Sequence, residues 1–333
     1  MAGEIYKMNK LDGIIKKIEK LGYISSDIEE KDFIHVAYGC DERYIFPVGI
    51  SMTSILKYNK NVVFHIFVDY IKKDDIKRIK QTMIQAVCFI YYLDSSILKK
   101  LYQNPFWGWA TYIRLVAAKE LGKKIEKCIY LDADTMCMSE IKTLFKLDMQ
   151  HKIIGAVADS FLNIPMYKKI MKDLSLTENY FNAGILLIDL NKWQENDISE
   201  RAFKLLLDNP DKFSSAPDQN VLNYLLKDDV LWLSRNVNVI GKTINDCDKP
   251  CFIHFTGPKP WTAWYNSETS KEIDKEYHNI YLNSAWKDEP IWQPENAFQY
   301  RQQSKKYIKE KRYFNAIKMQ YKYLYLKLIG GLK

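Results

Sequence analysis

Two aspartates separated by a single residue, Asp132 and Asp134, follow the apolar segment Cys128-Ile129-Tyr130-Leu131. A short apolar run of this kind predicts a buried strand, and ligands of α/β proteins bind outside the carboxyl ends of strands. Two carboxylates at such a point suit a hard divalent cation that bridges to phosphate oxygens. Because an isolated Asp-x-Asp pair is also common in solvated turns and helix caps, its position after the strand carries the prediction.

A second chemical feature lies in the segment FIHFTGPKPW at residues 252–261, far along the chain from the aspartates. The predicted strand in it ends at His254, whose imidazole could complete a mixed nitrogen and oxygen donor set that Mn²⁺ tolerates better than Ca²⁺ does. Gly257 permits close backbone approach to a phosphate, and Lys259 could neutralise its charge. A lone histidine is otherwise most often a structural residue. An alternative joins Cys247, Cys251 and His254 as a zinc site, but that set lacks an obvious fourth ligand.

The elements that would position these residues follow from the apolar pattern. Continuous apolar runs, each typical of a strand covered on both faces, occupy residues 33–38, 62–68, 86–93, 128–132, 153–158 and 183–188. Apolar spacings of three and four predict helices over residues 45–58, 74–85 and 108–121, and Pro217 opens another over 217–227, followed by a strand at 230–234. This alternation predicts an α/β fold with a mostly parallel central sheet.

The two ends of the chain differ from this middle part. An amphipathic helix is expected over residues 9–21, which gives an N-terminal helical extension at 1–30 ahead of a single domain at 31–283. Residues 284–333 are expected to form a linker and a basic region. Its last part, residues 299–333, holds ten Lys or Arg against Glu310 alone, a net charge of +9 in a chain whose total is +8, so the remainder is near neutral.

The basic end predicts an amphipathic helix over residues 313–328, because its apolar side chains recur at spacings of three and four: Phe314, Ile317, Tyr321, Leu324 and Leu328. Such a helix could lie on an anionic lipid surface at the inner membrane. Alternatively, its apolar stripe packs on the domain. Nucleic acid is not an expected partner, because no recognised nucleic-acid module accompanies the basic end.

Composition excludes several classes of protein. A chain of 333 residues that is 47% hydrophobic can bury an enzyme-sized core, which excludes disordered and fibrous classes. Six cysteines without C-x-x-C spacing favour reduced thiols in the cytoplasm. No window approaches 18 apolar residues, so a spanning segment is not expected.

Taken in order, the motifs resemble glycosyltransferase family 8, the retaining UDP-sugar transferases that include glycogenin. Within that family the chain is most similar to the bacterial lipopolysaccharide core glucosyl- and galactosyltransferases. The resemblance covers about residues 33 to 262, and the ordered set is far more specific than any one motif. The matching segments are VAYGCDERYIFPVGISMTSIL, FHIFV, TYIRL, YLDAD, YFNAGILLIDLNKW, APDQNVLN and IHFTGPKPW.

The resemblance implies a Rossmann-like nucleotide-sugar domain of the GT-A type and a role for each matching residue. Gly39 and Asp41 would lie against the uracil and ribose, and Arg114 would contact the diphosphate or donor sugar. Asp132, Asp134 and His254 would hold Mn²⁺, with Mg²⁺ as a possible substitute. The remaining implied contacts are Asn182, Ala183, Asp218 and Gln219 along the sugar, Gly257 and Lys259 on phosphate, and Asp159 on the acceptor.

The implied reaction is retaining, Mn²⁺-dependent transfer of glucose or galactose from its UDP carrier to the lipopolysaccharide outer core with α linkage, on the cytoplasmic face of the inner membrane. Retention could use Asp218 or Gln219 as a nucleophile, or a front-face route in which the leaving phosphate accepts the acceptor's proton. The alternatives are self-glucosylation or another acceptor, and a non-catalytic membrane-binding adaptor on a transferase fold.

Overall fold

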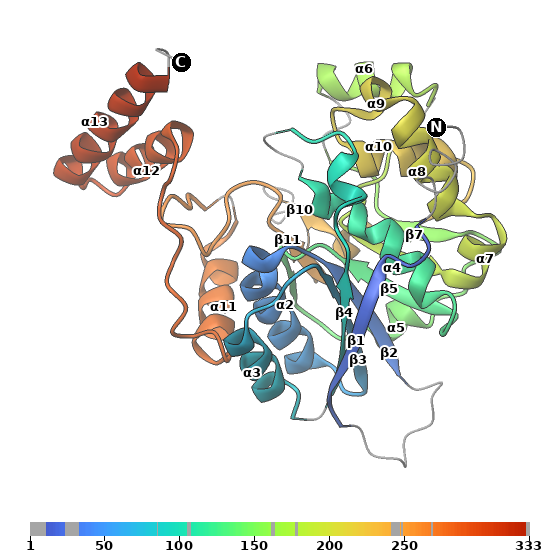
Figure 1. The fold of residues 1–333 in the computed structure, drawn as a ribbon. Coiled ribbons are helices and arrows are strands. Elements are labelled where there is room, and N and C mark those ends of the chain that lie inside the picture. The colour runs from blue at the N-terminus through green and yellow to red at the C-terminus, as the bar shows by residue number, and fades with distance from the viewer. Residues whose placement is uncertain are drawn as a thin grey trace.

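The computed structural model describes residues 11–330 apart from residues 24–32, 85, 105–107, 161–163, 177–178, 241–246, 248 and 268. An eight-stranded sheet forms the centre of the described chain, in the order β1-β4-β3-β2-β5-β8-β7-β9 (Figure 1). Its strands are β1 (Ile15–Gly22), β2 (Ile34–Gly39), β3 (Val62–Val68), β4 (Val87–Leu93), β5 (Lys127–Leu131), β7 (Ile154–Ala156), β8 (Ile185–Asp189) and β9 (Val230–Trp232).

The sheet is mostly parallel, as the apolar runs predict. Strands β4, β3, β2 and β5 are parallel neighbours, and β7 is parallel to β9. Strand β8 runs antiparallel between β5 and β7. The expected α/β class is therefore confirmed, with two reversed strands, β8 in the middle of the sheet and β1 at its edge.

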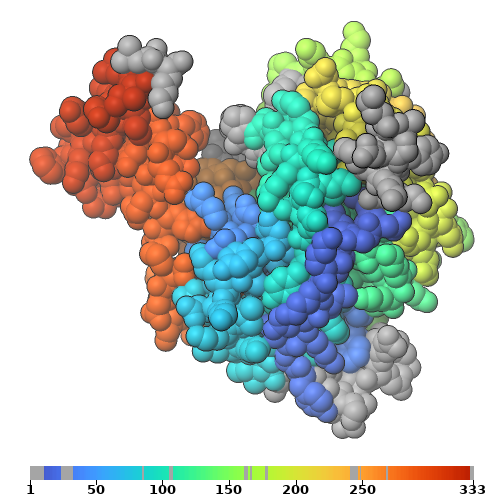
Figure 2. Space-filling model, viewed as in Figure 1, coloured from blue at the N-terminus to red at the C-terminus, as the bar shows by residue number. Residues whose placement is uncertain are grey.

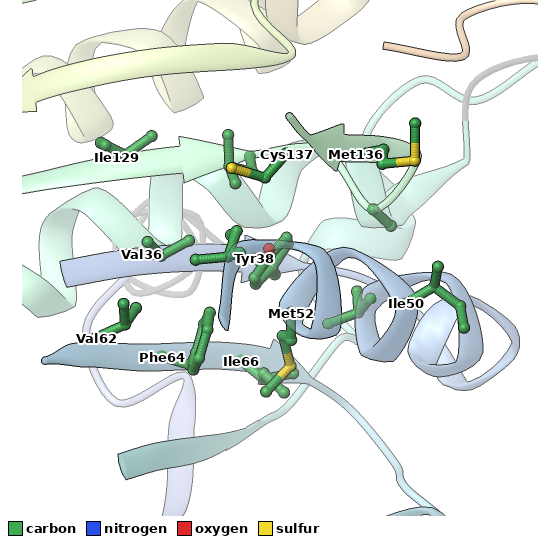
Figure 3. Packing of buried hydrophobic residues seen from close by; sticks show 14 of the residues in the cluster. Val36, Tyr38, Ile50, Met52, Val62, Phe64, Ile66, Ile129, Met136 and Cys137 are labelled. Carbon is green, nitrogen blue, oxygen red and sulfur yellow. The ribbon is translucent and has the colours of Figure 1, made fainter. Parts of the chain in front are cut away.

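Helices cover both faces of this sheet because successive strand residues point to opposite sides. Val36 and Tyr38 of β2 face the core under α2, while Ala37 between them faces the core under α4. Figure 3 shows the first of these cores, where side chains of β2, β3 and β5 meet the underside of α2. The helices on that side are α2 (Ile45–Tyr58), α3 (Lys73–Thr82), α5 (Lys142–Phe145) and α11 (Lys271–Leu282). The other side carries α4 (Ile113–Leu121), α7 (Leu190–Glu195), α8 (Ile198–Asp208), α9 (Pro210–Phe213) and α10 (Pro217–Leu226).

A small second sheet brings the two chemical motifs together. It has the order β10 (Val239–Ile240), β11 (Phe252–His254) and β6 (Thr135–Cys137). Strand β11 pairs antiparallel with β6 so that His254 lies opposite Thr135. Since Thr135 directly follows Asp134, this register places the histidine beside the aspartate pair.

The helix expected over residues 9–21 is wrong. Residues 15–22 form strand β1, which pairs antiparallel with β4 at the edge of the sheet. Its lysines are exposed while Leu21 is buried, an arrangement that suits an edge strand. The rest of the expected extension, residues 1–10 and 24–30, lies outside the described residues, so the domain boundary near residue 30 stays a prediction.

The C-terminal region begins with an irregular segment from residue 284 and ends in two helices, α12 (Ala297–Lys309) and α13 (Tyr313–Gly330). The two helices pack against each other and project from one side of the body (Figures 1 and 2). The helix expected at 313–328 is thus confirmed, whereas residues 331–333 are outside the described part. The remaining elements of the described residues are α6 (Pro165–Asp173) and four 3₁₀ turns, two of which cover Glu42–Tyr44 and Trp109–Tyr112. Two other 3₁₀ turns cover Leu98–Lys100 and Arg235–Val237. No helix in the described part is long and apolar enough to cross a bilayer.

Candidate active site

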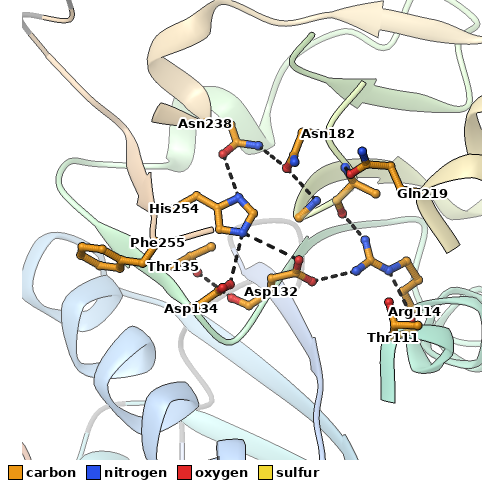
Figure 4. Close-up of polar contacts among 12 residues, drawn as sticks. Thr111, Arg114, Asp132, Asp134, Thr135, Asn182, Gln219, Asn238, His254 and Phe255 are labelled. Carbon is orange, nitrogen blue, oxygen red and sulfur yellow. Dashed lines mark hydrogen bonds and ion pairs between the residues drawn. The ribbon is translucent and has the colours of Figure 1, made fainter. Parts of the chain in front are cut away.

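Asp132, Asp134 and His254 converge beyond the carboxyl end of β5. The Nε2 atom of His254 lies 3.2 Å from Oδ1 of Asp134 and 3.8 Å from Oδ2 of Asp132 (Figure 4). One ligand atom from each residue falls within 4.8 Å of the others, and among the described residues this is the one such group that could hold a metal ion. The alternative zinc group of Cys247, Cys251 and His254 does not form.

A chain of hydrogen bonds fixes which nitrogen of His254 faces the carboxylates. The backbone N–H of Gly184 donates to Oδ1 of Asn182 (3.0 Å), which also accepts from Nδ2 of Asn238 (2.9 Å). The remaining Oδ1 of Asn238 lies 3.2 Å from Nδ1 of His254. Because an amide oxygen can only accept, Nδ1 carries a proton, and in the neutral imidazole the lone pair of Nε2 therefore points at the two carboxylates. Three acceptors that face one another need a cation between them, so the donor set suits a divalent ion.

Gly184 is required where it stands. A Cβ atom there would lie 2.1 Å from Cε1 of His254 and 2.9 Å from Oδ2 of Asp132. The start of β8 therefore approaches the donor set more closely than any side chain would allow. Sequence reasoning named neither Gly184 nor Asn238. The glycine in FNAG, just ahead of an apolar run, could have indicated a close approach of the backbone to the site. No sequence pattern pointed to Asn238.

Arg114, in the first turn of α4, links Asp132 of the donor set to α10 and to the chain just before β8. Its Nη2 donates to Oδ1 of Asp132 (2.9 Å), its Nε lies 2.8 Å from Oδ2 of Asp218, and its Nη1 donates to the carbonyl oxygen of Ala183. The side chain is buried, with the guanidinium 5.1 Å from the centre of the Tyr130 ring. Burial alone would lower its pKa, but the carboxylates of Asp132 and Asp218 outweigh that effect and raise the pKa further. A permanent positive charge therefore lies next to the donor set.

Gln219 connects two other predicted residues. Its Oε1 accepts from the N–H of Ala183 (2.9 Å), and its Nε2 donates to Oδ2 of Asp159 (3.2 Å). The same Asp159 oxygen accepts from Nδ2 of Asn182 (3.3 Å). The first turn of α10 thereby holds the Asn182–Ala183 turn in place. Asp159, expected at the acceptor, is buried within this network.

Lys259 reaches the site from the loop after β11. Its Nζ donates to Oδ2 of Asp134 and to the carbonyl oxygen of Phe255. Gly257 lies exposed two residues earlier in the same loop. The lysine is thus paired with one of the two carboxylates of the donor set.

The two carboxylates differ in electrostatic environment. Burial raises the pKa of Asp132, and the Arg114 charge only partly offsets it. Burial also acts to raise the pKa of Asp134, but the charge of Lys259, joined by that of His254 when its imidazole is protonated, outweighs burial and holds that pKa below its usual range. Asp134 is therefore the carboxylate most firmly kept ionised.

A pocket adjoins this group on the side of β2. It is lined by Gly39, Asp41, Tyr44, Arg114, Asp132 and Asp134, among others. Asp41 caps the 3₁₀ turn that follows β2, where its Oδ1 accepts from the N–H groups of Arg43 (3.0 Å) and Tyr44 (3.2 Å). Gly39 has a packing reason to be glycine, since a Cβ there would lie 2.7 Å from the Ile113 side chain. Tyr44 was not named by sequence reasoning, and burial raises its pKa to about 12.

The comparisons with known proteins agree with this geometry. A model of glycosyl transferase family 8 matches residues 35–265, and a model of the family's C-terminal region matches residues 274–327. The chain belongs to glycosyl transferase family 8. The similarity of this glycosyltransferase to curated relatives extends over nearly its whole length.

A lipopolysaccharide 1,2-glucosyltransferase of Escherichia coli (strain K12) is 30% identical over 91% of this chain and 94% of its own. A lipopolysaccharide 1,3-galactosyltransferase of Salmonella typhimurium is 29% identical over 93% of this chain and 96% of its own. Among solved structures, the galactosyltransferase LgtC, in complex with donor and acceptor sugar analogues, aligns with a TM-score of 0.66 at 19% identity. That alignment covers 75% of this chain and 96% of LgtC, and it confirms the expected GT-A fold.

Proposed function

We propose that this glycosyltransferase is a retaining, Mn²⁺-dependent hexosyltransferase. In this proposal it moves glucose or galactose from a UDP carrier to the lipopolysaccharide outer core with α linkage. The observation that carries the proposal is the convergence of Asp132, Asp134 and His254 beside the permanent charge of Arg114. The two enteric relatives named above supply the acceptor class, since one is a lipopolysaccharide glucosyltransferase and the other a galactosyltransferase.

The chemistry follows from the charge that develops on the leaving group. When a sugar leaves its diphosphate, negative charge grows on the β-phosphate while the sugar becomes oxocarbenium-like. A divalent ion held by Asp132, Asp134 and His254 would supply electrostatic stabilisation of that charge. Arg114 and Lys259, which contact the same two aspartates, add fixed positive charge at the same point.

The contacts of α10 favour the front-face route to retention. Asp218 is buried and paired with Arg114, which stabilises the carboxylate and weakens it as a nucleophile. Both ends of the Gln219 amide are engaged, one by Ala183 and the other by Asp159. These residues are better placed to shape the sugar pocket than to form a covalent bond to its anomeric carbon.

The decisive experiment is a transfer assay with purified protein, Mn²⁺, UDP-glucose or UDP-galactose, and truncated lipopolysaccharide core acceptors. Wild type should transfer one of these hexoses, and Asp134→Asn should lose at least about a hundredfold in rate, because one of the proposed cation ligands loses its charge. Asp74→Asn, an exposed position on α3, is the matched control. Failure of the wild type to transfer or hydrolyse any UDP-hexose would refute the proposal, and full retention of biological activity by Asp134→Asn would favour the adaptor.

The proposal includes peripheral attachment to anionic lipid on the cytoplasmic face of the inner membrane. The apolar stripe of α13 is exposed, with 81% of Phe314, 70% of Tyr321 and 71% of Leu328 accessible. The alternative in which this stripe packs on the body is therefore wrong. An exposed aromatic stripe flanked by lysines is the pattern of an interfacial helix.

A further inference from the structure

The segment between the body and α12 is joined by hydrogen bonds to the loop that carries Lys259. Trp292 donates its backbone N–H to the carbonyl oxygen of Trp261 (3.0 Å), and Ala263 donates to the carbonyl oxygen of Trp292 (2.9 Å). These bonds form a short parallel bridge between Thr262 and Trp292. The loop from residue 259 to 263 is consequently held between Asp134 on one side and the C-terminal region on the other.

The indole ring of Trp292 extends from this bridge toward the 3₁₀ turn Glu42–Tyr44, which follows β2. It meets the Tyr44 ring edge to face, with 5.6 Å between ring centres and an angle of 87°. It meets the Trp261 ring in the same way, at 6.1 Å and 81°. The guanidinium of Arg43 stacks over the Trp292 ring at 5.0 Å, and its far end lies 3.6 Å from the carboxylate of Glu295.

Tyr44 is the residue through which this cluster reaches the active site. It lines the same pocket as Asp41, Asp132 and Asp134, and its backbone is tied to Asp41. The Trp261 ring lies edge-on to Tyr44 at 6.5 Å from a second direction. Edge-to-face aromatic pairs have a preferred geometry, so two of them at about 90° fix the plane of the tyrosine ring.

We propose that Trp292 is a positioning residue for the donor site. Its indole supports Tyr44 on one side and the Lys259–Trp261 loop on the other, so the C-terminal linker lies behind the part of the pocket wall that Tyr44 forms. The inference rests on the proposed function, because it takes the pocket beside Asp41 and Asp134 to be the site of the UDP-sugar. It gives the C-terminal region a role in donor binding that is separate from attachment to lipid.

The test uses the full chain without vesicles, so that membrane attachment does not enter. UDP binding in the presence of Mn²⁺ is measured by calorimetry for the wild type, Trp292→Ala and Trp292→Phe. Trp292→Ala should raise the UDP Kd and the donor KM by about five- to twentyfold, with kcat within about threefold, because two aromatic contacts and one cation–π contact are lost. Trp292→Phe should recover part of the affinity, since it keeps an aromatic ring.

Trp286→Phe provides the matched control in the same linker. Trp286 is fully buried against Gly49 of α2, so its replacement lowers stability through the core. Its UDP affinity should stay near that of wild type. Equal UDP affinity of wild type and Trp292→Ala would overturn the inference, as would an equal loss in Trp286→Phe. If Trp292→Ala does not fold, wild-type affinity and donor KM in Trp292→Phe would overturn it.

The two proposals fail in distinguishable ways. Wild-type protein that binds no UDP with Mn²⁺ would refute the proposed function and this inference together. Wild-type protein that binds UDP while Trp292→Ala binds it equally well would refute the inference alone.

Discussion

At the scale of single residues, the site depends on the direction of a hydrogen-bond chain that begins at a backbone donor. The N–H of Gly184 fixes the orientation of the Asn182 amide, and Asn182 fixes that of the Asn238 amide. Asn238 in turn determines which ring nitrogen of His254 carries the proton in the neutral imidazole. Every amide along the chain has both its donor and its acceptor assigned. A residue that never touches the proposed ion, Asn238, thus decides whether the imidazole presents a lone pair or a proton.

Asn238→Ala is therefore expected to weaken Mn²⁺ binding by about 10- to 100-fold, because the imidazole loses the partner that fixes its tautomer. Electron paramagnetic resonance of the free ion measures this affinity directly. His254→Ala is the reference for complete loss of the ligand. Unchanged Mn²⁺ affinity in Asn238→Ala would contradict the assigned chain.

At the scale of elements, two strands that pair far from their own sequence neighbourhood shape the molecule. Strand β11 delivers His254 to Asp134 through its register with β6. Strand β1 covers the edge of β4 and becomes the outermost strand on that side of the sheet. In β1 only the side chain of Leu21 is buried at 4% exposure, whereas Ile18 remains 42% exposed.

This strand supplies a matched pair of substitutions. Leu21→Ala should lower the free energy of unfolding by about 2–4 kcal/mol through the cavity that it leaves. Ile18→Ala removes an exposed side chain from the same strand and should change the free energy of unfolding by less than about 0.5 kcal/mol. Chemical denaturation measures both values. If residues 15–22 formed a helix with both side chains on its buried face, both substitutions would lower the free energy of unfolding strongly.

Helix α13 is the second element with a testable role. Replacement of Phe314, Tyr321 and Leu328 by serine should reduce co-sedimentation with phosphatidylglycerol vesicles, because it removes the exposed apolar stripe. Lys318→Gln should lower vesicle affinity about fivefold at low salt, since one basic residue near an anionic surface contributes about 1 kcal/mol. Transfer to a soluble acceptor should be unchanged in both variants. Undiminished sedimentation of the triple variant would argue against α13 as the lipid-binding element.

At the scale of the whole molecule, the proposed donor site is assembled from segments spread over most of the chain. It takes Asp41 from the first half of the sheet, Asp218 from α10, and Lys259 from the loop after β11. None of these segments is near another in sequence. A ligand that contacts all of them binds the folded state and has no equivalent site in the unfolded chain.

Mn²⁺ and UDP together are therefore expected to raise the melting temperature. At a ligand concentration of about a hundred times the Kd, the free energy of unfolding should increase by about 2.7 kcal/mol. For a chain of this length, that increase raises the melting temperature by about 4 °C. UDP without a divalent ion should give a smaller rise, and Asp134→Asn should abolish the effect of the metal. Differential scanning fluorimetry measures each case, and an equal rise with and without Mn²⁺ would contradict the metal-bridged mode of donor binding.

The sequence by itself determined the α/β class, the helices that cover the sheet, the short list of candidate metal ligands and, through the ordered motifs, the family. These depend on short-range patterns: apolar runs make strands, apolar spacings of three and four make helices, and Asp132 and Asp134 are placed by the strand just before them. Only the tertiary structure decided that residues 15–22 form a strand, because their apolar spacing also suits a helix and the free edge of β4 settles the choice. Likewise, only folding brought Asn238 to His254 and Trp292 to Tyr44, because no local pattern encodes which distant side chains will share a hydrogen bond or a ring contact.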